Sequence, residues 1–369
     1  MASSSIGNAD ELKSGTQGVE LREKVDMPAR KPLVPGSAPS SDAESDLIVA
    51  RAPGSNADVV PVPLGVIVDG ARSKAERREY LIYTTFKNGG TLGALVWMLT
   101  MGTTWVQWSA FALFYVLNLL GHNMAHHRYF GHGAFKTSKP MRYLLAILAQ
   151  SGGYGSALYW VANHRRHHSH TDKPGDLHSP YFDGQGRALE NKKQGFGHAH
   201  IKWAFDNTET DMEVFGKGLL ADPALVFAHK TRWVWFWTSG IVVPAIWGFA
   251  FGGTWQAALG TVLIAGAMRM MLALHAVGMI NSVCHLWGTR RFEGQGRATN
   301  NWFVALVSLG EGWHNNHHAH PRSASNSTRW WEVDMTYWVI RALEAVGLVW
   351  DVKRMPRDPD GRVKGEVAV

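Results

Sequence analysis

Two long apolar stretches without a formal charge divide the chain. Residues 88–127 contain no Asp, Glu, Lys or Arg, and neither do residues 233–268. A membrane-spanning helix takes about 20 residues, so each stretch is long enough for two helices joined by a tight turn, at Gly102 in the first and at Gly252 and Gly253 in the second. Because neither stretch offers a polar face to water, we expect four membrane spans in two hairpins and not a buried helical pair of a soluble protein.

Basic residues gather in the segments that flank these hairpins. They stand in residues 71–87, in the segment between the hairpins, and in residues 269–297. Positive charge marks the cytoplasmic side of a membrane, so the pattern predicts an integral, multi-pass membrane protein whose termini and histidine-rich segments are cytoplasmic. A third apolar segment, residues 141–160, is interrupted by three glycines, and we expect it at the membrane interface. The predicted fold is all-α, with four transmembrane helices and a cytoplasmic helical cap.

The two ends of the chain lack this pattern. Residues 1–75 are rich in Ser, Gly, Ala, Pro and charge without a sustained period, which is typical of a disordered tail. We predict one membrane domain in residues 76–355 and a short C-terminal tail in residues 356–369. Residues 1–70 hold six Lys and Arg against ten Asp and Glu, and the remainder holds 31 against 20. The basic remainder suits a membrane surface, an acidic redox partner or a phosphate-bearing substrate, and its apolar character argues against nucleic acid.

Histidines supply the candidate chemistry. The chain has 18 histidines and a single cysteine, Cys284, so a thiolate cluster is excluded and a metal would be held by nitrogen and oxygen. Residues at i, i+3 and i+4 share one helix face, and two groups have this spacing: His164, His167 and His168, and His314, His317 and His318. Two helices that each offer three imidazoles predict a site for two metal ions. Asn281 and His285, at i and i+4 where the fourth span ends, could complete it.

The first histidine group leaves two alternatives open. His122 and His126 have the ideal i, i+4 spacing of a helix, whereas His127 and His132 are five residues apart and point in different directions on a straight helix. Spacing favours the first pair, or else a role for His127 and His132 on two different metals where the helix ends.

The ligand type limits the metal. All-imidazole ligation suits zinc, copper, iron or nickel, and no Glu-x-x-His motif of a carboxylate-bridged di-iron bundle accompanies these groups. A hydrolytic zinc site would want a carboxylate base. Glu311 is the one acid close to the last group, and it could equally orient a ligand histidine.

Four motifs occur in a fixed order, namely "HRYFGH", "HRRHH", "NSVCHLWG" and "EGWHNNHH", with "GAFKTS" after the first and "DLHSP" after the second. In these motifs the sequence resembles the membrane fatty acid desaturases, specifically the acyl-CoA (stearoyl, delta-nine) type, over about residues 78–355. The resemblance implies that the predicted membrane domain is a desaturase domain.

The resemblance also implies a ligand set. The family's first motif matches His127 and His132, which leaves His122 and His126 outside it, and Asn281 matches an asparagine that reaches a metal through water. The implied histidine ligands are His127, His132, His164, His167, His168, His285, His314, His317 and His318. The chain departs from the family at Gly133, where Arg is frequent, and at His320, where Phe is frequent.

The implied reaction is oxidative. Two iron ions, dioxygen and two electrons would remove two hydrogens from a saturated acyl chain carried on CoA, a carrier protein or a lipid. The sequence has no haem-binding cytochrome domain and no cysteine set for an iron–sulfur cluster, so electrons would come from a separate donor of the ferredoxin, rubredoxin or cytochrome b5 type. Trp160, His200 and Trp203 match the family's segments and could contact the substrate head group or the donor, with packing inside the domain as the alternative.

Two other functions compete with this one. A membrane di-iron hydroxylase, or a desaturase of a lipid-bound or other lipid substrate, would use the same ligands. A metal-transport protein would place ionisable groups near the midplane of its spans, whereas the histidines here cluster at the cytoplasmic ends and between the hairpins.

Overall fold

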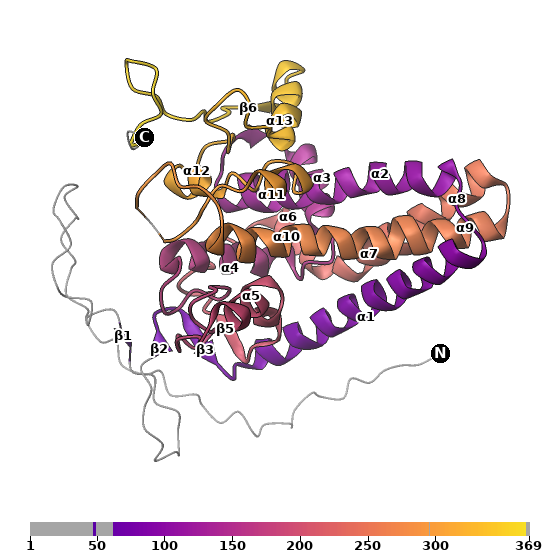
Figure 1. The fold of residues 1–369 in the computed structure, drawn as a ribbon, viewed down its shortest axis with the longest axis horizontal. Coiled ribbons are helices and arrows are strands. Elements are labelled where there is room, and N and C mark those ends of the chain that lie inside the picture. Colours follow the sequence, from indigo (N-terminus) through magenta and orange to yellow (C-terminus); the bar gives the residue numbers. More distant parts are fainter. Residues whose placement is uncertain (1–46, 49–61, 295, 367–369) are drawn as a thin grey trace, which may run out of the picture. The chain divides into compact units, whose positions relative to one another are not determined.

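The computed structural model describes residues 47–48, 62–294 and 296–366, and most of these residues are helical (Figure 1). The first hairpin consists of α1 (Ala71–Thr100) and α2 (Trp105–Leu120), and α2 continues directly into the π-helix η1 (Gly121–Gly131). The second consists of α7 (Arg232–Trp237), η3 (Thr238–Val242) and α8 (Val243–Gly252), followed by α9 (Trp255–Thr261), η4 (Val262–Met268) and α10 (Arg269–Leu286).

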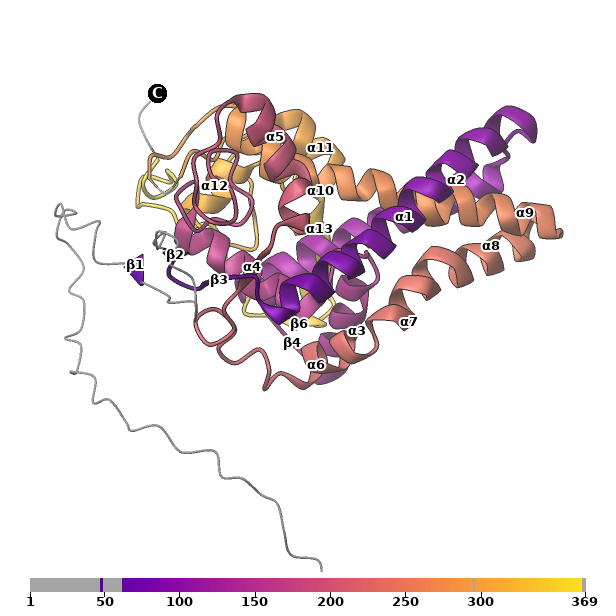
Figure 2. The same ribbon diagram turned by 90° about the horizontal axis from the view of Figure 1, so that it is seen from below.

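The chain reverses at the two glycine positions that the sequence predicted. Gly102 has φ 71° and Gly253 has φ 69°, in the left-handed region that favours glycine. Each turn is followed by a threonine cap: Thr104 accepts from the backbone N–H of Val106, and Thr254 accepts from that of Ala257. The second hairpin is closely paired at its turn, where α8 and α9 lie side by side (Figure 2), whereas α1 and α2 diverge from their turn and both pack against η4 (Figure 1).

Two continuous helical segments are long and apolar enough to cross a membrane, Arg232–Gly252 and Trp255–Leu286. The first hairpin packs against the second, since Ala94 of α1 and Ile264 of η4 are fully buried in one cluster. Large apolar side chains on the opposite sides of these helices are exposed, among them Leu99 (87%) and Trp255 (76%).

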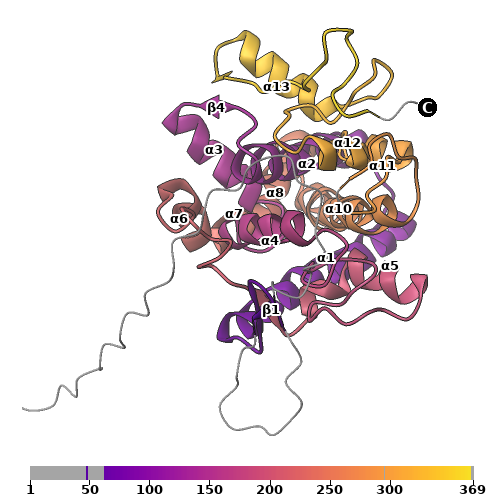
Figure 3. The ribbon, with the colours of Figure 1, turned by 90° about the vertical axis from the view of Figure 1, so that its left-hand side faces the viewer.

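The cap is built from short helices and two-stranded ribbons at one end of the hairpins (Figure 1), and Figure 3 shows it face on. Its helices are α3 (Lys139–Gln150), α4 (Ala157–His170), α5 (Lys192–His200), η2 (Lys202–Phe205), α6 (Pro223–Lys230), α11 (Trp302–Val307), α12 (His314–Ala319) and α13 (Met335–Ala345). Antiparallel pairs join β1 (Leu47–Ile48) to β2 (Val62–Pro63), β3 (Val66–Val68) to β5 (Thr208–Thr210) and β4 (Lys136–Thr137) to β6 (Val349–Trp350). The main core lies between η1, α3, α4 and α6, with Phe130, Leu145, Leu158 and Leu225 buried.

The predicted tails differ from the structure at their inner boundaries. Residues 1–46 and 49–61 lie outside the described residues, but residues 62–75 form β2, β3 and the first turn of α1. The partner of β3 is β5, more than 130 residues away, so no local pattern reveals this strand. At the other end Val363 is buried in a cluster with Phe292 and Met355, and Glu366 pairs with Arg291 and Arg329. Residues 356–366 therefore pack against the domain.

Candidate metal centre

The first histidine motif lies on a π-helix. In η1 the backbone N–H of His132 donates to the carbonyl of His127 at 3.1 Å, which is a hydrogen bond across five residues. The wider turn of a π-helix stacks residues that are five apart, and the ring centroids of the two histidines are 4.9 Å apart. The expectation that this pair points apart on a straight helix was wrong because the helix is not an α-helix here.

Five histidines from three elements form the first group, which comprises His127, His132, His164, His168 and His317. The Nε2 atom of His317 lies 3.0 Å from that of His127 and 3.1 Å from that of His168. The Nε2 atoms of His132 and His164 are 2.7 Å apart. All five ligand atoms lie within 4.8 Å of one another.

Four further histidines form the second group, which comprises His167, His285, His314 and His318. Their Nε2 atoms form a chain, with 3.3 Å between His167 and His318, 3.1 Å between His318 and His314, and 3.1 Å between His314 and His285. On α4, His164 and His168 belong to the first group and His167 to the second. On α12 the order is reversed, since the middle histidine, His317, belongs to the first group and the other two belong to the second. All nine histidines of the implied ligand set fall into these two groups.

Carboxylates fix the tautomer of three of these rings. The Nδ1–H groups donate to one carboxylate each: His127 to Glu311 at 2.7 Å, His167 to Asp176 at 3.0 Å and His285 to Asp172 at 2.9 Å. A proton held at Nδ1 leaves the Nε2 lone pair free to bind a metal. Glu311 therefore orients a ligand histidine, His127, which is one of the two roles that the sequence allowed for it.

The donor set fits two metal ions. Imidazole nitrogens about 2.0–2.1 Å from one ion at right angles to each other are about 2.9 Å apart, and the Nε2 pairs here are separated by 2.7 to 3.3 Å. Burial lowers the pKa of His314, His317 and His318 well below the ordinary value, so these rings are neutral. A neutral ring carries one N–H, so His317 Nε2 can donate to only one of its two Nε2 neighbours, whereas a cation binds the lone pairs of all the rings around it.

A buried ion network supports Glu311. The guanidinium of Arg128 donates to Glu311 Oε1 at 2.8 Å and to Asp334 Oδ1 at 3.0 Å. Burial by itself raises the pKa of Glu311, but Arg128 and His127 lower it more, so the pKa lies below the ordinary value and the group is a carboxylate. Asn326 Nδ2 donates to the second oxygen of Glu311 at 2.9 Å.

Sequence reasoning missed Asp172, Asp176, Arg128 and Asp334. Asp172 and Asp176 follow the second motif by four and eight residues, and this proximity is a signal that could have found them. His178 was also missed: it is buried, and its ring centroid lies 4.2 Å from that of His167. Asp334 carries no such signal because it reaches Arg128 across 206 residues of sequence.

The competing pair, His122 and His126, belongs to neither group. Both are buried beside Trp160, and His126 stacks on it with ring centroids 4.9 Å apart. Neither ring nitrogen of His126 has a hydrogen-bond partner within the described residues. His164 also stacks on Trp160 with ring centroids 4.9 Å apart, so two nearly parallel imidazoles hold the indole in place.

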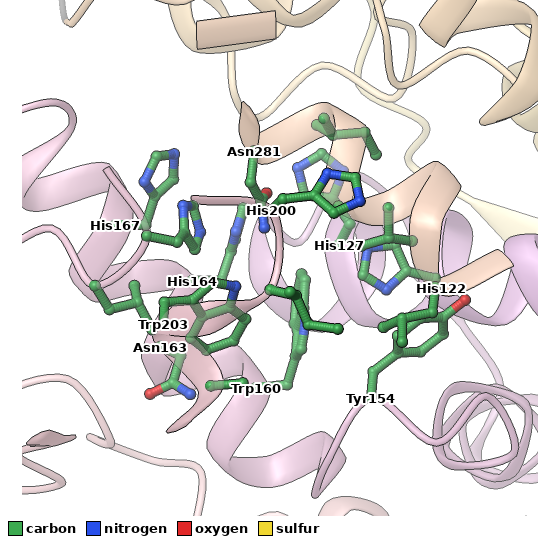
Figure 4. A pocket seen from close by; sticks show the side chains of 18 of the residues that line it. His122, His127, Tyr154, Trp160, Asn163, His164, His167, His200, Trp203 and Asn281 are labelled. Carbon is green, nitrogen blue, oxygen red and sulfur yellow. The ribbon is translucent and has the colours of Figure 1, made fainter. Parts of the chain in front are cut away.

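A cavity adjoins the metal centre (Figure 4). It encloses about 830 Å³ free of protein atoms, including the space at its open mouth. Trp160, His200, Trp203 and Asn281 all line it, together with His122 and Tyr154 at one end. Two side chains of α10 hold the His200 ring in place: its Nδ1 lies 3.0 Å from Ser282 Oγ and its Nε2 lies 2.9 Å from His275 Nδ1.

The two departures from the family pattern lie outside both histidine groups. Gly133 has φ 58°, and its carbonyl accepts a hydrogen bond from the Lys353 ammonium group. The Nε2–H of His320 donates to the carbonyl of Lys364 at 2.8 Å.

Comparisons with known proteins agree with this centre. A protein-family model described as "Fatty acid desaturase" matches residues 95–352. The chain is 34% identical to hex-5-enoyl-(acyl-carrier protein) acetylenase of Moorena producens (strain JHB), over 75% of this chain and 86% of that protein. It is 32% identical to delta-9 acyl-lipid desaturase 2 of Arabidopsis thaliana, over 75% and 84%, and 33% identical to acyl-CoA C20 delta5-desaturase of Anemone leveillei, over 67% and 73%.

Proposed function

The chain belongs to the fatty acid desaturase family, and on this premise we propose that it inserts a cis double bond into a saturated acyl chain, using dioxygen and two electrons from a separate protein. It is an oxidoreductase of the membrane di-iron desaturase class. The balance of the reaction is one –CH2–CH2– unit, one O2, two electrons and two protons giving one –CH=CH– unit and two waters.

We propose that the two ions are iron, held by the nine histidines of the two groups, with Asn281 reaching one ion through water. Iron supplies the oxidising power that breaks an unactivated C–H bond, which no side chain can deprotonate. The protein's own contribution is positional. Glu311, Asp176 and Asp172 hold three rings with their Nε2 lone pairs toward the centre.

The acyl chain lies in the cavity beside the centre under this proposal. Trp160 lines this cavity, and stacking on His126 and His164 holds its ring in place. A rigid wall fixes which methylenes face the metals, and an error of about 1 Å in such positioning costs roughly 100-fold in rate. Trp203 and His200 line the same cavity and are proposed to contact the substrate.

The molecule that carries the acyl group, CoA, a carrier protein or a lipid, is a separate part of the proposal. The three relatives are named for acyl groups on a carrier protein, a lipid and CoA, so the relatives do not decide among these carriers. Acyl-CoA of the stearoyl, delta-nine type remains the prediction from the motifs. The donor, of the ferredoxin, rubredoxin or cytochrome b5 type, is likewise proposed.

We propose that both hairpins cross the membrane, which gives four spans with the metal centre on the cytoplasmic side. Trp105 (63% exposed) and Trp255 (76% exposed) stand next to the two hairpin turns, and tryptophans mark the membrane–water interface. The four helices leave large apolar side chains uncovered, including Leu92 and Leu99 of α1. Lipid contact accounts for this exposure.

Expression in a host that cannot make unsaturated fatty acids, followed by fatty-acid analysis, tests the proposal. We expect new monounsaturated products with the wild type and none with His317→Ala. Identical profiles would rule out desaturation by this centre. Mass spectrometry of the same extracts would detect a hydroxylated product, which would favour the hydroxylase alternative.

A further inference from the structure

One edge of the metal centre reaches the protein surface. In the first histidine group His132 and His168 are half-buried, whereas His127, His164 and His317 are buried, and all four members of the second group are buried. Gly133, directly after His132, is exposed. Among the nine ligand histidines, His132 and His168 are therefore the two that reach toward solvent.

Cationic side chains surround this edge. We define the His132 face by His132, Gly133, Lys136, Arg322 and Lys353. Hydrogen bonds join the three segments of this face. The backbone N–H of Lys353 donates to the carbonyl of Ala134 at 2.8 Å, its ammonium group donates to the carbonyl of Gly133, and the N–H of Ala324, two residues after Arg322, donates to the carbonyl of Lys353 at 2.8 Å.

The three cations of the His132 face lie close enough to interact. Partial burial, and then the charges of Arg322 and Lys136, lower the pKa of Lys353. Arg322 is exposed, and 69% of the Lys136 side chain is exposed. Asp351, which lies 2.7 Å from Lys136, is the one acid that pairs with them among the described residues, so the face is net positive.

The His132 face is separate from the cavity. None of its five residues lines the cavity, whose walls come from residues such as Trp203, His200 and Leu274. A macromolecule on this face would approach the metals without covering the route of the acyl chain.

We propose that an acidic one-electron carrier protein docks on the His132 face and delivers both electrons of each turnover there, in two successive encounters. This inference rests on the proposed function and names a partner surface for the same centre. Complementary charge raises the rate of encounter by about 10- to 1,000-fold, and contact beside a ligand histidine keeps the transfer distance short. An acidic carrier of the acyl group would dock at the cavity mouth instead, and the test separates the two.

The test uses full-length protein in detergent or lipid, with reduced [2Fe–2S] ferredoxin as the acidic probe. The variant is the double charge reversal Lys136→Glu with Arg322→Glu, and Lys353→Gln is a milder second variant in case the reversal disturbs the loop. The matched control is Lys74→Glu with Lys192→Glu, at exposed positions of α1 and α5, which lie on the opposite side of the cap from β4 and β6 (Figures 1 and 3).

We expect the KM for ferredoxin to rise about 10-fold in the double reversal, with a weaker dependence on salt, because steering by charge is screened. The value of kcat at saturating ferredoxin, the KM for the acyl substrate and turnover with dithionite should stay at the wild-type level, and the control should match the wild type. Lys353→Gln should move the ferredoxin KM in the same direction by a smaller factor.

Three results would overturn the docking proposal: an unchanged ferredoxin KM in all face variants, an equal change in the control, or a rise in the acyl-substrate KM instead. Wild type that turns over with dithionite but shows no salt-dependent turnover with ferredoxin would also overturn it, and would leave the proposed function intact. Wild type that turns over with neither reductant would overturn the proposed function and this inference with it.

Discussion

Glu311 Oε2 accepts a hydrogen bond of 2.7 Å from His127 Nδ1, and the other oxygen of the same carboxylate accepts from Arg128, the next residue along η1. One acid from the segment before α12 thus orients a ring on η1 and neutralises the cation beside it. Because α12 supplies ligands to both groups, the contact between Glu311 and His127 also fixes α12 relative to η1, which are two of the three main ligand-bearing elements.

Glu311→Gln should weaken the metal centre. The amide can accept from only one side at a time and leaves Arg128 with less compensating charge, so we expect metal affinity or activity to fall roughly 10- to 100-fold. Metal analysis of purified protein and a turnover assay measure this. Glu344→Gln, at a partly exposed acid of α13 that pairs with Arg341, is the control and should match the wild type. Full metal content and activity in Glu311→Gln would remove Glu311 from the ligand-orienting role.

His317 and His320 form a matched pair in one short segment. His317 Nε2 lies at the centre of the first group, whereas His320 bonds the Lys364 carbonyl at the surface. We expect His317→Ala to lose bound iron and to lose more activity than an orienting partner does, beyond about 100-fold, and we expect His320→Ala to keep both. Iron content and turnover of the two variants check this. Equal losses in both would indicate damage to α12 and not the loss of a ligand.

Local patterns predicted much of the fold and of the site. The hairpin turns at Gly102 and Gly253 follow from uncharged length and from glycine, and the i, i+3, i+4 groups follow from helical spacing. The π-helix could not be predicted in this way, because helical spacing rules assume the four-residue hydrogen bond of an α-helix, whereas His132 bonds to His127 across five residues. Asp334 was also out of reach, since its partner Arg128 is distant in sequence.

Substitutions in and beside η1 can decide which pair of the first histidine group binds metal, His122 with His126 or His127 with His132. His126 faces Trp160 with both ring nitrogens unpaired within the described residues, so His126→Phe removes an unsatisfied buried polar group that costs roughly 1–3 kcal/mol. We expect this variant to keep its iron and to unfold at a thermal midpoint no lower than that of the wild type, and we expect His132→Ala to lose iron. Iron analysis with thermal unfolding in detergent separates them. Loss of iron in His126→Phe alone would restore the i, i+4 pair as the ligand pair.

Leu274 of α10 lines the cavity, whereas Leu272, two residues earlier, is 46% exposed. Leu274→Ala adds space at the cavity wall, so we expect the product profile to shift toward longer acyl chains. Leu272→Ala removes the same atoms from an exposed position and should leave the profile unchanged. Gas chromatography of fatty acids from expressing cells measures both. An unchanged profile in Leu274→Ala would mean that this wall does not limit the chain.

His198 of α5 links stability to pH, away from the metal centre. Its Nε2–H donates to Asp206 at 3.0 Å and its Nδ1–H donates to the Ser179 carbonyl at 2.9 Å. Burial by itself lowers the pKa of His198, but the hydrogen bond and the charge of Asp206 raise it more, so the folded-state pKa lies above the ordinary value of 6.5.

A raised pKa means that the folded state prefers protonated His198. The stabilisation is therefore fully present below the unfolded pKa of about 6.5 and is lost as pH rises through the folded-state pKa. We expect His198→Gln to unfold at a lower temperature than the wild type in mildly acidic buffer, with the gap narrowing in alkaline buffer. Thermal unfolding in detergent across this pH range measures the gap, and Asp206→Asn should reproduce its pH dependence. A gap that stays constant with pH would show that His198 contributes by packing and not through its charge.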